Sequence, residues 1–289
     1  MATAIGYAGY LTSLEYAKVR TQGRPVGDKD PSRSQVAIIE HADVKRMLLA
    51  QKAYCEGALA LELYCARLVD EQHTGAPDAA REAALLLEVL TPIAKSWPSE
   101  WCLEANSLAI QVHGGYGYTR DFSVEQYWRD NRLNMIHEGT HGIQGMDLLG
   151  RKVVMDGGAG LKLLATTINA TIARAGQVPG LAEHAATLAA ALQKLGAATK
   201  AAWSTGDPQD ALANATPYLQ AFGHVVLAWI WLDVALAIPT DATKTIAAHA
   251  GRMRAAAYFY HYELPKIGAW LRVVESRDPL CADTPEDAF

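Results

Sequence analysis

The sequence predicts an all-α protein with two successive helical bundles. Hydrophobic residues make up 50% of the 289 residues and recur at helical spacing. Val and Ile rarely alternate with polar residues over more than four positions, so strand patterns are scarce. Stretches rich in Gly and Pro separate the helical segments.

The first helix is predicted over residues 2–20, because apolar side chains recur there on or near one face. These side chains are Tyr7, Tyr10, Leu11, Leu14 and Ala17. A loop rich in Gly, Pro and Asp follows at 22–33. Two long helices are expected at about 42–71 and 78–112, with Pro92 and Pro98 expected to kink or divide the second.

A Gly-rich turn at 114–117 precedes a short helix near 123–130 and a longer one at about 139–155. The run Gly157-Gly158-Ala159-Gly160 is the clearest boundary in the chain, and it divides a domain of residues 1–156 from a domain of residues 157–289. Breaks at 178–180 and 205–208 help to separate four further helices. These are predicted at 160–175, 180–204, 208–237 and 241–276.

Charge and composition exclude several classes of protein. The net charge is −5 without a basic stripe, so nucleic acid is not expected as a partner. The four cysteines form no CxxC motif and no secretory leader is visible, which favours the reducing cytoplasm. The apolar run at 222–239 contains His224 and Asp233 and falls short of the roughly 20 clean residues of a membrane span, so a buried core helix is expected.

The stretch from Gln111 to Gln144 concentrates the residues that could carry chemistry. Within it, His137-Glu138-Gly139-Thr140-His141 matches the H-E-x-x-H pattern, in which one helix presents two zinc ligands and a general base. Gly139, Gly142 and Gly145 each cost such a helix about 1 kcal/mol. No His or Glu follows His141 before Glu183, so a third ligand is missing at short range and no metal is expected.

A larger pattern covers the same stretch. The segments Q-x-x-GG-x-GY and RD-x-R-x-x-x-I-x-EGT-x-x-IQ resemble the C-terminal domain of the acyl-CoA dehydrogenases, an up-down four-helix bundle. The resemblance implies that Glu138 is the base that removes the α-proton of an acyl-CoA, while the β-hydride passes to N5 of FAD. Gly139 would let the backbone approach the substrate. Thr140 would lie at the cofactor and could cap the next helix. The alternative is that Glu138 is only a carboxylate favoured by a helix dipole.

The first helix carries a second resemblance to this family. The sequence YAKVRTQGR is similar to the segment that closes the first helix of the dehydrogenase bundle. It implies that Arg20 reaches the pyrophosphate of a flavin held mainly by a neighbouring subunit, with Gln22 nearby. Gln111 and the turn at Gly114 and Gly115 would reach the adenosine end, so the resemblance implies a homodimer or tetramer. The alternative is that Arg20 is a solvated cation near a helix C-terminus.

The chain is similar to the long subgroup of the family, of the 3-methylmercaptopropionyl-CoA dehydrogenase type, which has an additional helical C-terminal domain. It departs from the commoner pattern at Gly23, His137 and Gly142. The family's helical N-terminal domain and central β-domain have no counterpart in the sequence.

Two interpretations therefore stay open beside the zinc motif. The chain is the C-terminal half of an FAD-dependent acyl-CoA dehydrogenase, complete only with its N-terminal half, or it is a non-catalytic helical assembly subunit. The first implies an acyl-CoA substrate, electron-transfer flavoprotein as the electron acceptor, and a possible separate N-terminal chain.

Overall fold

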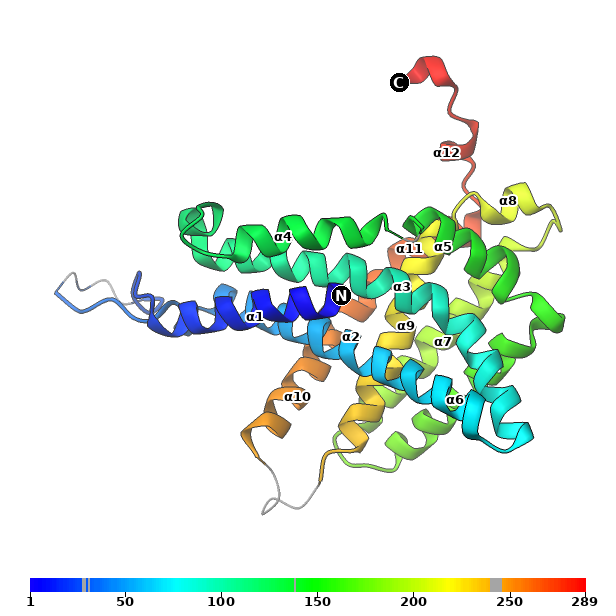
Figure 1. Cartoon of the computed structure of the whole chain (residues 1–289), viewed down its shortest axis with the longest axis horizontal. Helices are drawn as coiled ribbons and strands as arrows, with labels where there is room; N and C mark the ends of the chain where they lie inside the picture. Colours follow the sequence, from blue (N-terminus) through cyan, green and yellow to red (C-terminus); the bar gives the residue numbers. More distant parts are fainter. Residues whose placement is uncertain (28–29, 31, 138, 240–245) are drawn as a thin grey trace. The chain divides into compact units, whose positions relative to one another are not determined.

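The computed structural model describes residues 1–27, 30, 32–137, 139–239 and 246–289. In these residues the regular secondary structure is helical, apart from an isolated antiparallel bridge between Thr21 and Ala37. The predicted all-α class is confirmed. The chain divides into two compact units, Met1–Leu59 with Pro98–Glu138 and Ala60–Trp97 with Gly139–Phe289. The two longest helices, α2 (Ala42–Thr74) and α3 (Pro77–His113), contribute a segment to each unit (Figure 1).

The first unit is the predicted four-helix bundle. It contains α1 (Ala2–Val19), one segment each of α2 and α3, and α4 (Val124–Arg132). Glycine allows α1 to approach α3 closely, because a Cβ added at Gly6 would lie 2.7 Å from the Cβ of Cys102. The helices predicted at 2–20, 42–71 and 123–130 are thus present with small shifts of their ends.

Buried amides connect three helices of this unit. Asn131 of α4 donates from Nδ2 to the Asn106 side-chain oxygen of α3 at 2.7 Å and to the carbonyl of Ala2 in α1 at 3.2 Å. Asn106 in turn donates to the carbonyl of Ile5 at 3.1 Å. Both asparagines are fully buried, so these hydrogen bonds satisfy polar groups that would be costly to leave unpaired. The network fixes α1 and α4 against α3.

The second unit is built around α9 (Ala215–Leu236), which contacts α5, α6, α7, α10 and α11. Its Trp229, Trp231 and Phe222 are among the largest fully buried side chains of the chain. The bounds of the surrounding helices are α5 His141–Asp147, α6 Met155–Gly176, α7 Ala182–Ala202, α8 Pro208–Leu212, α10 Ala247–Tyr258, α11 Ile267–Ser276 and α12 Leu280–Asp283.

Helix α9 is long and apolar enough to cross a membrane by length and composition alone. Of its most apolar window, however, 78% is buried within the chain. A core helix passes the same test of length and composition.

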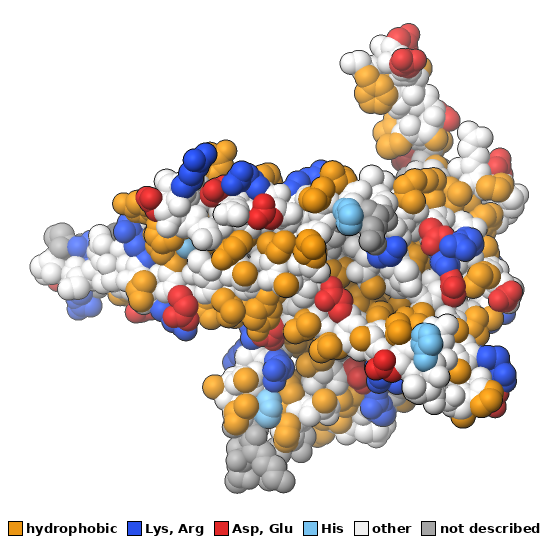
Figure 2. All heavy atoms as spheres, in the orientation of Figure 1, with side chains coloured by type: hydrophobic (Ala, Val, Ile, Leu, Met, Phe, Trp, Pro, Cys, Tyr) orange, Lys and Arg blue, Asp and Glu red, His pale blue; other side chains and the backbone are white. Residues whose placement is uncertain are grey.

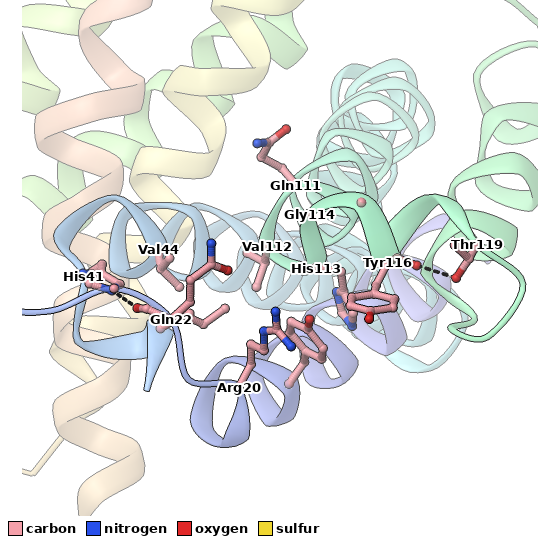
Figure 3. Close-up of a pocket in the computed structure, with 14 residues that line it drawn as sticks. Arg20, Gln22, His41, Val44, Gln111, Val112, His113, Gly114, Tyr116 and Thr119 are labelled. Atoms are coloured by element: carbon pink, nitrogen blue, oxygen red, sulfur yellow. Dashed lines mark hydrogen bonds between the residues drawn. The ribbon is translucent and has the colours of Figure 1, made fainter. Parts of the chain in front are cut away.

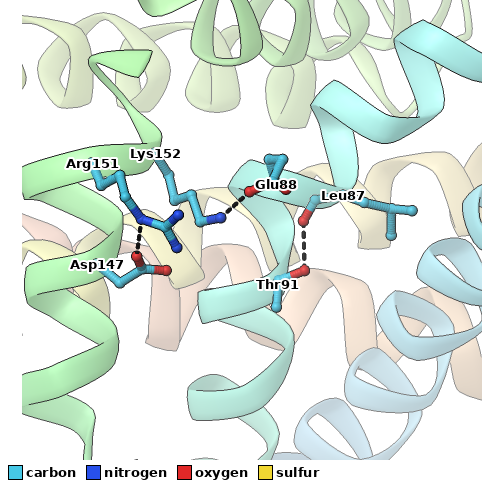
Figure 4. Close-up of polar contacts among 6 residues, drawn as sticks. All are labelled: Leu87, Glu88, Thr91, Asp147, Arg151 and Lys152. Atoms are coloured by element: carbon cyan, nitrogen blue, oxygen red, sulfur yellow. Dashed lines mark hydrogen bonds and ion pairs between the residues drawn. The ribbon is translucent and has the colours of Figure 1, made fainter.

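A π-helical turn, Leu148–Lys152, follows α5 and places Lys152 against α3 (Figure 4). The ammonium group of Lys152 is buried and pairs with Glu88, whose side chain is 44% exposed. Burial lowers the pKa of Lys152 below its usual value. The residue directly before it, the exposed Arg151, pairs with Asp147 one turn earlier at 2.7 Å. The buried lysine and its carboxylate partner join α3 to this turn.

Several predicted helices have different bounds or are interrupted. The helix expected at 139–155 begins only at His141 and passes into the π-helical turn. The backbone is left-handed at Asp156, Gly157 and Gly158, which makes a kink inside α6 near the predicted Gly-rich break. The prediction of one continuous helix at 208–237 was wrong. The backbone of Asn214 is not helical, and it separates α8 from α9.

The prolines had unequal effects. Helix α3 continues through Pro92 and Pro98, so the expected division did not occur. Burial of both prolines against other apolar residues offsets the hydrogen bonds that proline cannot donate. The helix predicted at 241–276 is instead interrupted before α11 by a π-helical turn, Phe259–Glu263, and a 3-10 turn, Leu264–Lys266, that contains Pro265. Its predicted first residues, 241–245, lie outside the described residues.

Candidate functional site

A pocket of about 730 Å³ lies in the first unit, where the end of α1, the start of α2 and the end of α3 meet (Figure 3). Five predicted cofactor residues line it together: Arg20, Gln22, Gln111, Gly114 and Gly115. They come from two stretches of chain about ninety residues apart. The fold therefore brings both family-like motifs to one cavity.

The segment after α1 is held in place by backbone hydrogen bonds. The Ile38 amide donates to the Arg20 carbonyl at 2.8 Å, and the Gln22 amide donates to the Val36 carbonyl at 3.0 Å. The imidazole Nε2 of His41 lies 2.7 Å from the Gln22 carbonyl oxygen. These contacts hold the residues after α1 beside residues 36–41, so both segments line the pocket.

The electrostatics of the pocket suit an anion. Among the described residues that line it, Arg20 is the one formally charged side chain, and no carboxylate is present. The Arg20 guanidinium lies over the Tyr116 ring, 5.7 Å from its centroid (Figure 3). Such a cation–π contact holds the group in place while leaving its N–H donors available. A planar guanidinium of this kind can bind a phosphate through two parallel hydrogen bonds.

The glycine turn gives a ligand close access to the backbone. Gly114 has a φ of +62°, which favours glycine, and a Cβ added at Gly114 or Gly115 would meet no atom within 4 Å. Gly117 has a different role, because a Cβ there would lie 2.5 Å from the carbonyl oxygen of Ile110. A ligand can therefore come close to the backbone at Gly114 and Gly115, because the space next to these two glycines is open.

Nine further residues line the pocket that were not predicted as site residues, among them Tyr16, His41 and His113. The ring of Tyr16 stacks on that of His113, with centroids 4.2 Å apart. Burial lowers the pKa of His113, although a hydrogen bond from Nδ1 to the Ala109 carbonyl at 2.8 Å opposes this shift. Tyr16 precedes Arg20 by one helical turn, so the 3.6-residue period could have indicated it.

Gly139 and Thr140 are not among the described residues that line this pocket. Glu138 lies outside the described residues. Gly139 has a φ of +104°, which favours glycine. Thr140 occupies the N-cap position of α5, but its side chain makes no capping hydrogen bond, so that part of the expectation was wrong.

The zinc motif lacks the geometry that it needs. Gly139 and Thr140 are not helical, and α5 begins only at His141. His137 and His141 therefore do not lie one turn apart on one helix, as two ligands of an H-E-x-x-H site must. Within the described part of the chain, no group of three His, Cys, Asp or Glu side chains could hold a metal ion.

Comparison with known families agrees with the fold. Residues 1–153 match the family described as "Acyl-CoA dehydrogenase, C-terminal domain", and residues 164–285 match "Acetyl-CoA dehydrogenase C-terminal like". Since the first match covers more than half of the chain, the chain belongs to the acyl-CoA dehydrogenase family and corresponds to the C-terminal part of its members.

A similar curated relative is 3-methylmercaptopropionyl-CoA dehydrogenase of Ruegeria pomeroyi. It is 36% identical over 249 residues, which cover 83% of this chain and 41% of the relative. The resemblance to the long subgroup is thereby supported. The chain spans about half the length of the curated relatives it matches, from 41% to 49% of those most similar.

Two solved structures have the same fold. The Caenorhabditis elegans protein ACDH-11, in complex with C11-CoA, matches 99% of this chain and 46% of its own, with a TM-score of 0.76 and 17% identity. An acyl-CoA dehydrogenase of Bacillus anthracis, complexed with FAD, matches 99% of this chain and 48% of its own, with a TM-score of 0.73 and 19% identity. At these identities the likeness concerns the fold alone.

Proposed function

We propose that the chain is the C-terminal part of an FAD-dependent acyl-CoA dehydrogenase, which catalyses α,β-dehydrogenation of an acyl-CoA thioester. The observation that carries this proposal is the pocket that gathers Arg20, Gln22, Gln111, Gly114 and Gly115. Family membership supports the same reaction. Residues 1–156 would carry the cofactor-binding surface, and residues 157–289 would form an additional domain without catalytic residues.

The pocket residues fit the adenosine diphosphate half of FAD. Arg20 supplies a guanidinium for the diphosphate, with no carboxylate in the lining to compete for it. The side chains of Gln22 and Gln111 each offer an amide donor and acceptor for polar edges of the adenosine. The open space at Gly114 and Gly115 admits the ligand to backbone distance. Diphosphate recognition by these residues is thus consistent with both charge and shape.

Glu138 is proposed as the base that removes the substrate α-proton. FAD, when bound, supplies the acceptor for the β-hydride. A carboxylate with an ordinary pKa of about 4.3 is a weak base for a carbon acid, and exclusion of water by substrate raises its basicity. Gly139 has a positive φ, a conformation that favours glycine. Without a side chain there, the backbone beside the base could approach the thioester.

The resemblance extends the proposal to partners and setting. A flavin held mainly by a neighbouring subunit implies a homodimer or tetramer, in which Arg20 of one copy completes the site of another. Electron-transfer flavoprotein is the proposed electron acceptor, fatty acid metabolism the proposed context and the cytoplasm the proposed location. The N-terminal half of such an enzyme would supply the flavin ring site and most of the acyl-CoA pocket, from the same or a separate chain.

Flavin affinity tests the pocket directly. Arg20→Gln should weaken FAD binding, measured by quenching of flavin fluorescence, by about 10- to 100-fold, because a charge-assisted hydrogen bond contributes about 1.5–3 kcal/mol. Lys18→Gln is the matched control, since Lys18 is an exposed cation two residues earlier that pairs with Glu15 at 2.7 Å. Equal affinity of the Arg20 variant and the control would refute the assignment. A chain that binds no FAD would leave two interpretations, a half-enzyme that needs its N-terminal half and a non-catalytic assembly subunit.

The base requires a separate test in the protein with a complete flavin site. Glu138→Gln should lower acyl-CoA turnover by about 10²- to 10⁴-fold, the usual contribution of a general base, while acyl-CoA binding is retained. Glu15→Gln removes an exposed carboxylate elsewhere and should leave turnover unchanged. Undiminished turnover in the Glu138 variant would exclude it as the base.

A further inference from the structure

The last residues of the chain form a segment with no visible packing partner. After α11, the chain continues as α12 and a 3-10 turn, Glu286–Ala288, and neither element buries a residue. Leu280 is 71% exposed and Phe289 is fully exposed. Figure 1 shows this segment standing clear of the other helices of its unit. We call residues 279–289 the acidic tail, because Asp283, Glu286 and Asp287 are its charged side chains and it has no Lys or Arg.

The base of the acidic tail is held firmly. Arg277 ends α11 in the left-handed conformation, with a φ of 51°, and donates to the Ala201 carbonyl and to Ser204. The side-chain amide of Asn214 donates to the Asp278 carbonyl at 2.9 Å. A non-glycine residue in this conformation costs about 1–2 kcal/mol, so the surrounding contacts impose the direction in which the tail leaves.

Beyond that base, the tail makes hydrogen bonds only with itself. Within the described part of the chain, its hydrogen bonds end at residues 278–289, such as that of the Thr284 hydroxyl to the Leu280 carbonyl. Helical turns of four and three residues are not stable in water by themselves, because helix nucleation is unfavourable. A tail with such turns and two exposed apolar side chains would be stabilised by a surface on which it could pack.

A surface with a cation and exposed aromatic rings, which could bind the acidic tail, lies in the first unit, separate from the pocket that contains Arg20. A second cavity of about 280 Å³ is lined by Ile110, Tyr118, Arg120, Glu125, Trp128 and Arg129. Its aromatic walls are exposed, at 85% for Tyr118 and 39% for Trp128. Basic side chains gather over α4 in Figure 2. We call this cavity the α4 pocket.

The charge available in the α4 pocket comes from Arg120. Arg129 is already paired with Glu125, at 2.8 Å from its Nε, whereas no carboxylate in the described part of the chain pairs with Arg120. A cation beside two exposed aromatic rings and the side chain of Ile110 suits a peptide that presents an apolar anchor next to acidic residues. Trp, Tyr and Arg are also the residue types that most often dominate protein interfaces.

We propose that the acidic tail of one copy docks in the α4 pocket of a second copy. Leu280 or Phe289 would fill the space between Tyr118 and Trp128, and the tail carboxylates would pair with Arg120. Reciprocal exchange places each tail on its partner and closes the assembly as a dimer. The proposal rests on charge complementarity and on the unpacked tail, and it does not depend on flavin binding.

Cross-linking through Cys281 tests the docking with the full-length chain. Cys281 is exposed in the acidic tail, whereas Cys55 and Cys102 are buried. One copy carries Asp121→Cys, next to Arg120, together with Cys281→Ser, and it is mixed with the unmodified chain under mild oxidation. The matched control carries Lys194→Cys on the exposed side of α7, with the same Cys281→Ser change. Circular dichroism establishes that each variant is folded.

A disulfide-linked dimer should form with Asp121→Cys and not with Lys194→Cys, and it should disappear when both copies carry Cys281→Ser. Arg120→Glu should reduce the yield of this dimer, and Glu286→Lys together with Asp287→Lys in the other copy should restore it. The proposal is overturned if Asp121→Cys alone, with Cys281 present in the same chain, gives only an internally cross-linked monomer. It is equally overturned if the two cysteine positions cross-link to the same extent.

Discussion

Replacement of Asn131 by Ala tests the packing of the helices that form the pocket around Arg20. Asn131 donates to Asn106 at 2.7 Å and to the Ala2 carbonyl at 3.2 Å, and its own oxygen accepts from Asn134 at 2.9 Å. The variant removes all three hydrogen bonds. It leaves the Asn106 oxygen without that donor in the interior of the first unit, and it removes the hydrogen bond from α4 to the Ala2 carbonyl of α1.

The expected loss of stability follows from these contacts. Each hydrogen bond contributes about 1 kcal/mol net, so three account for about 3 kcal/mol. Deletion of side-chain atoms from a fully buried position adds a cavity cost. A loss of about 3 kcal/mol would lower the melting temperature of a domain of this size by roughly 6–12 °C. That is a large part of the total stability of an ordinary domain.

Differential scanning calorimetry provides the assay. Asn131→Asp keeps the shape of the side chain but cannot donate to Asn106 or Ala2, so it should destabilise the protein at least as much as Asn131→Ala. Asn134→Ala is the control, because it loses one hydrogen bond at a half-buried position and should cost about 1 kcal/mol or less. If Asn131→Ala and Asn134→Ala melt within experimental error of each other, the buried amide network does not stabilise this bundle.

Three further predictions concern a glycine, an ion pair and a histidine. Gly145→Ala should destabilise the protein by about 1–3 kcal/mol in urea unfolding, because its Cβ would lie 2.6 Å from a backbone oxygen of α9. Glu88→Gln should cost more than Arg151→Gln in the same assay, because it leaves the buried Lys152 ammonium uncompensated whereas Arg151 lies in an exposed pair. Burial lowers the pKa of His113, so stability should fall as pH drops below the unfolded value of about 6.5, and His113→Phe should reduce this dependence in thermal melts from pH 7.5 to 5.

For each of these three predictions, a specific result would contradict it. Gly196→Ala, where a Cβ would meet no atom within 4 Å, should be neutral or stabilising. A Gly145 variant that behaves in the same way would contradict the close contact with α9. Equal effects of the Glu88 and Arg151 changes would show that the Lys152 pair behaves as a surface pair. An unchanged slope of stability with pH in His113→Phe would show that this imidazole does not titrate differently in the folded protein.

Local patterns sufficed to predict the helical class, and the family resemblance predicted five of the fourteen residues that line the pocket. Arg20, Gln22, Gln111 and the glycines of the turn belong to short motifs, and the resemblance of those motifs to the family singled them out. His41 could not be found in this way, because it approaches Gln22 only after the chain has turned back through the bridge between Thr21 and Ala37. That contact depends on the tertiary path of the loop.

The interruptions of the helices also could not be predicted from local sequence patterns. Pro92 lies inside the continuous helix α3, whereas Pro265 lies in a 3-10 turn between α10 and α11. The local signal is the same at both prolines, and only the packing around each one decides whether the helix continues. The π-helical turns also escape a pattern based on 3.6 residues per turn. Existence of the helices was therefore predictable, but several of their ends were not.

Displacement of bound FAD by nucleotide fragments tests the central claim most directly. The chain, incubated with FAD and separated from free flavin, should carry a flavin absorption band, and ADP should displace the flavin while riboflavin should not. This result follows if Arg20, Gln22, Gln111 and the turn at Gly114 recognise the adenosine diphosphate half. Displacement by riboflavin but not by ADP, or flavin retained equally in Arg20→Gln, would contradict the account.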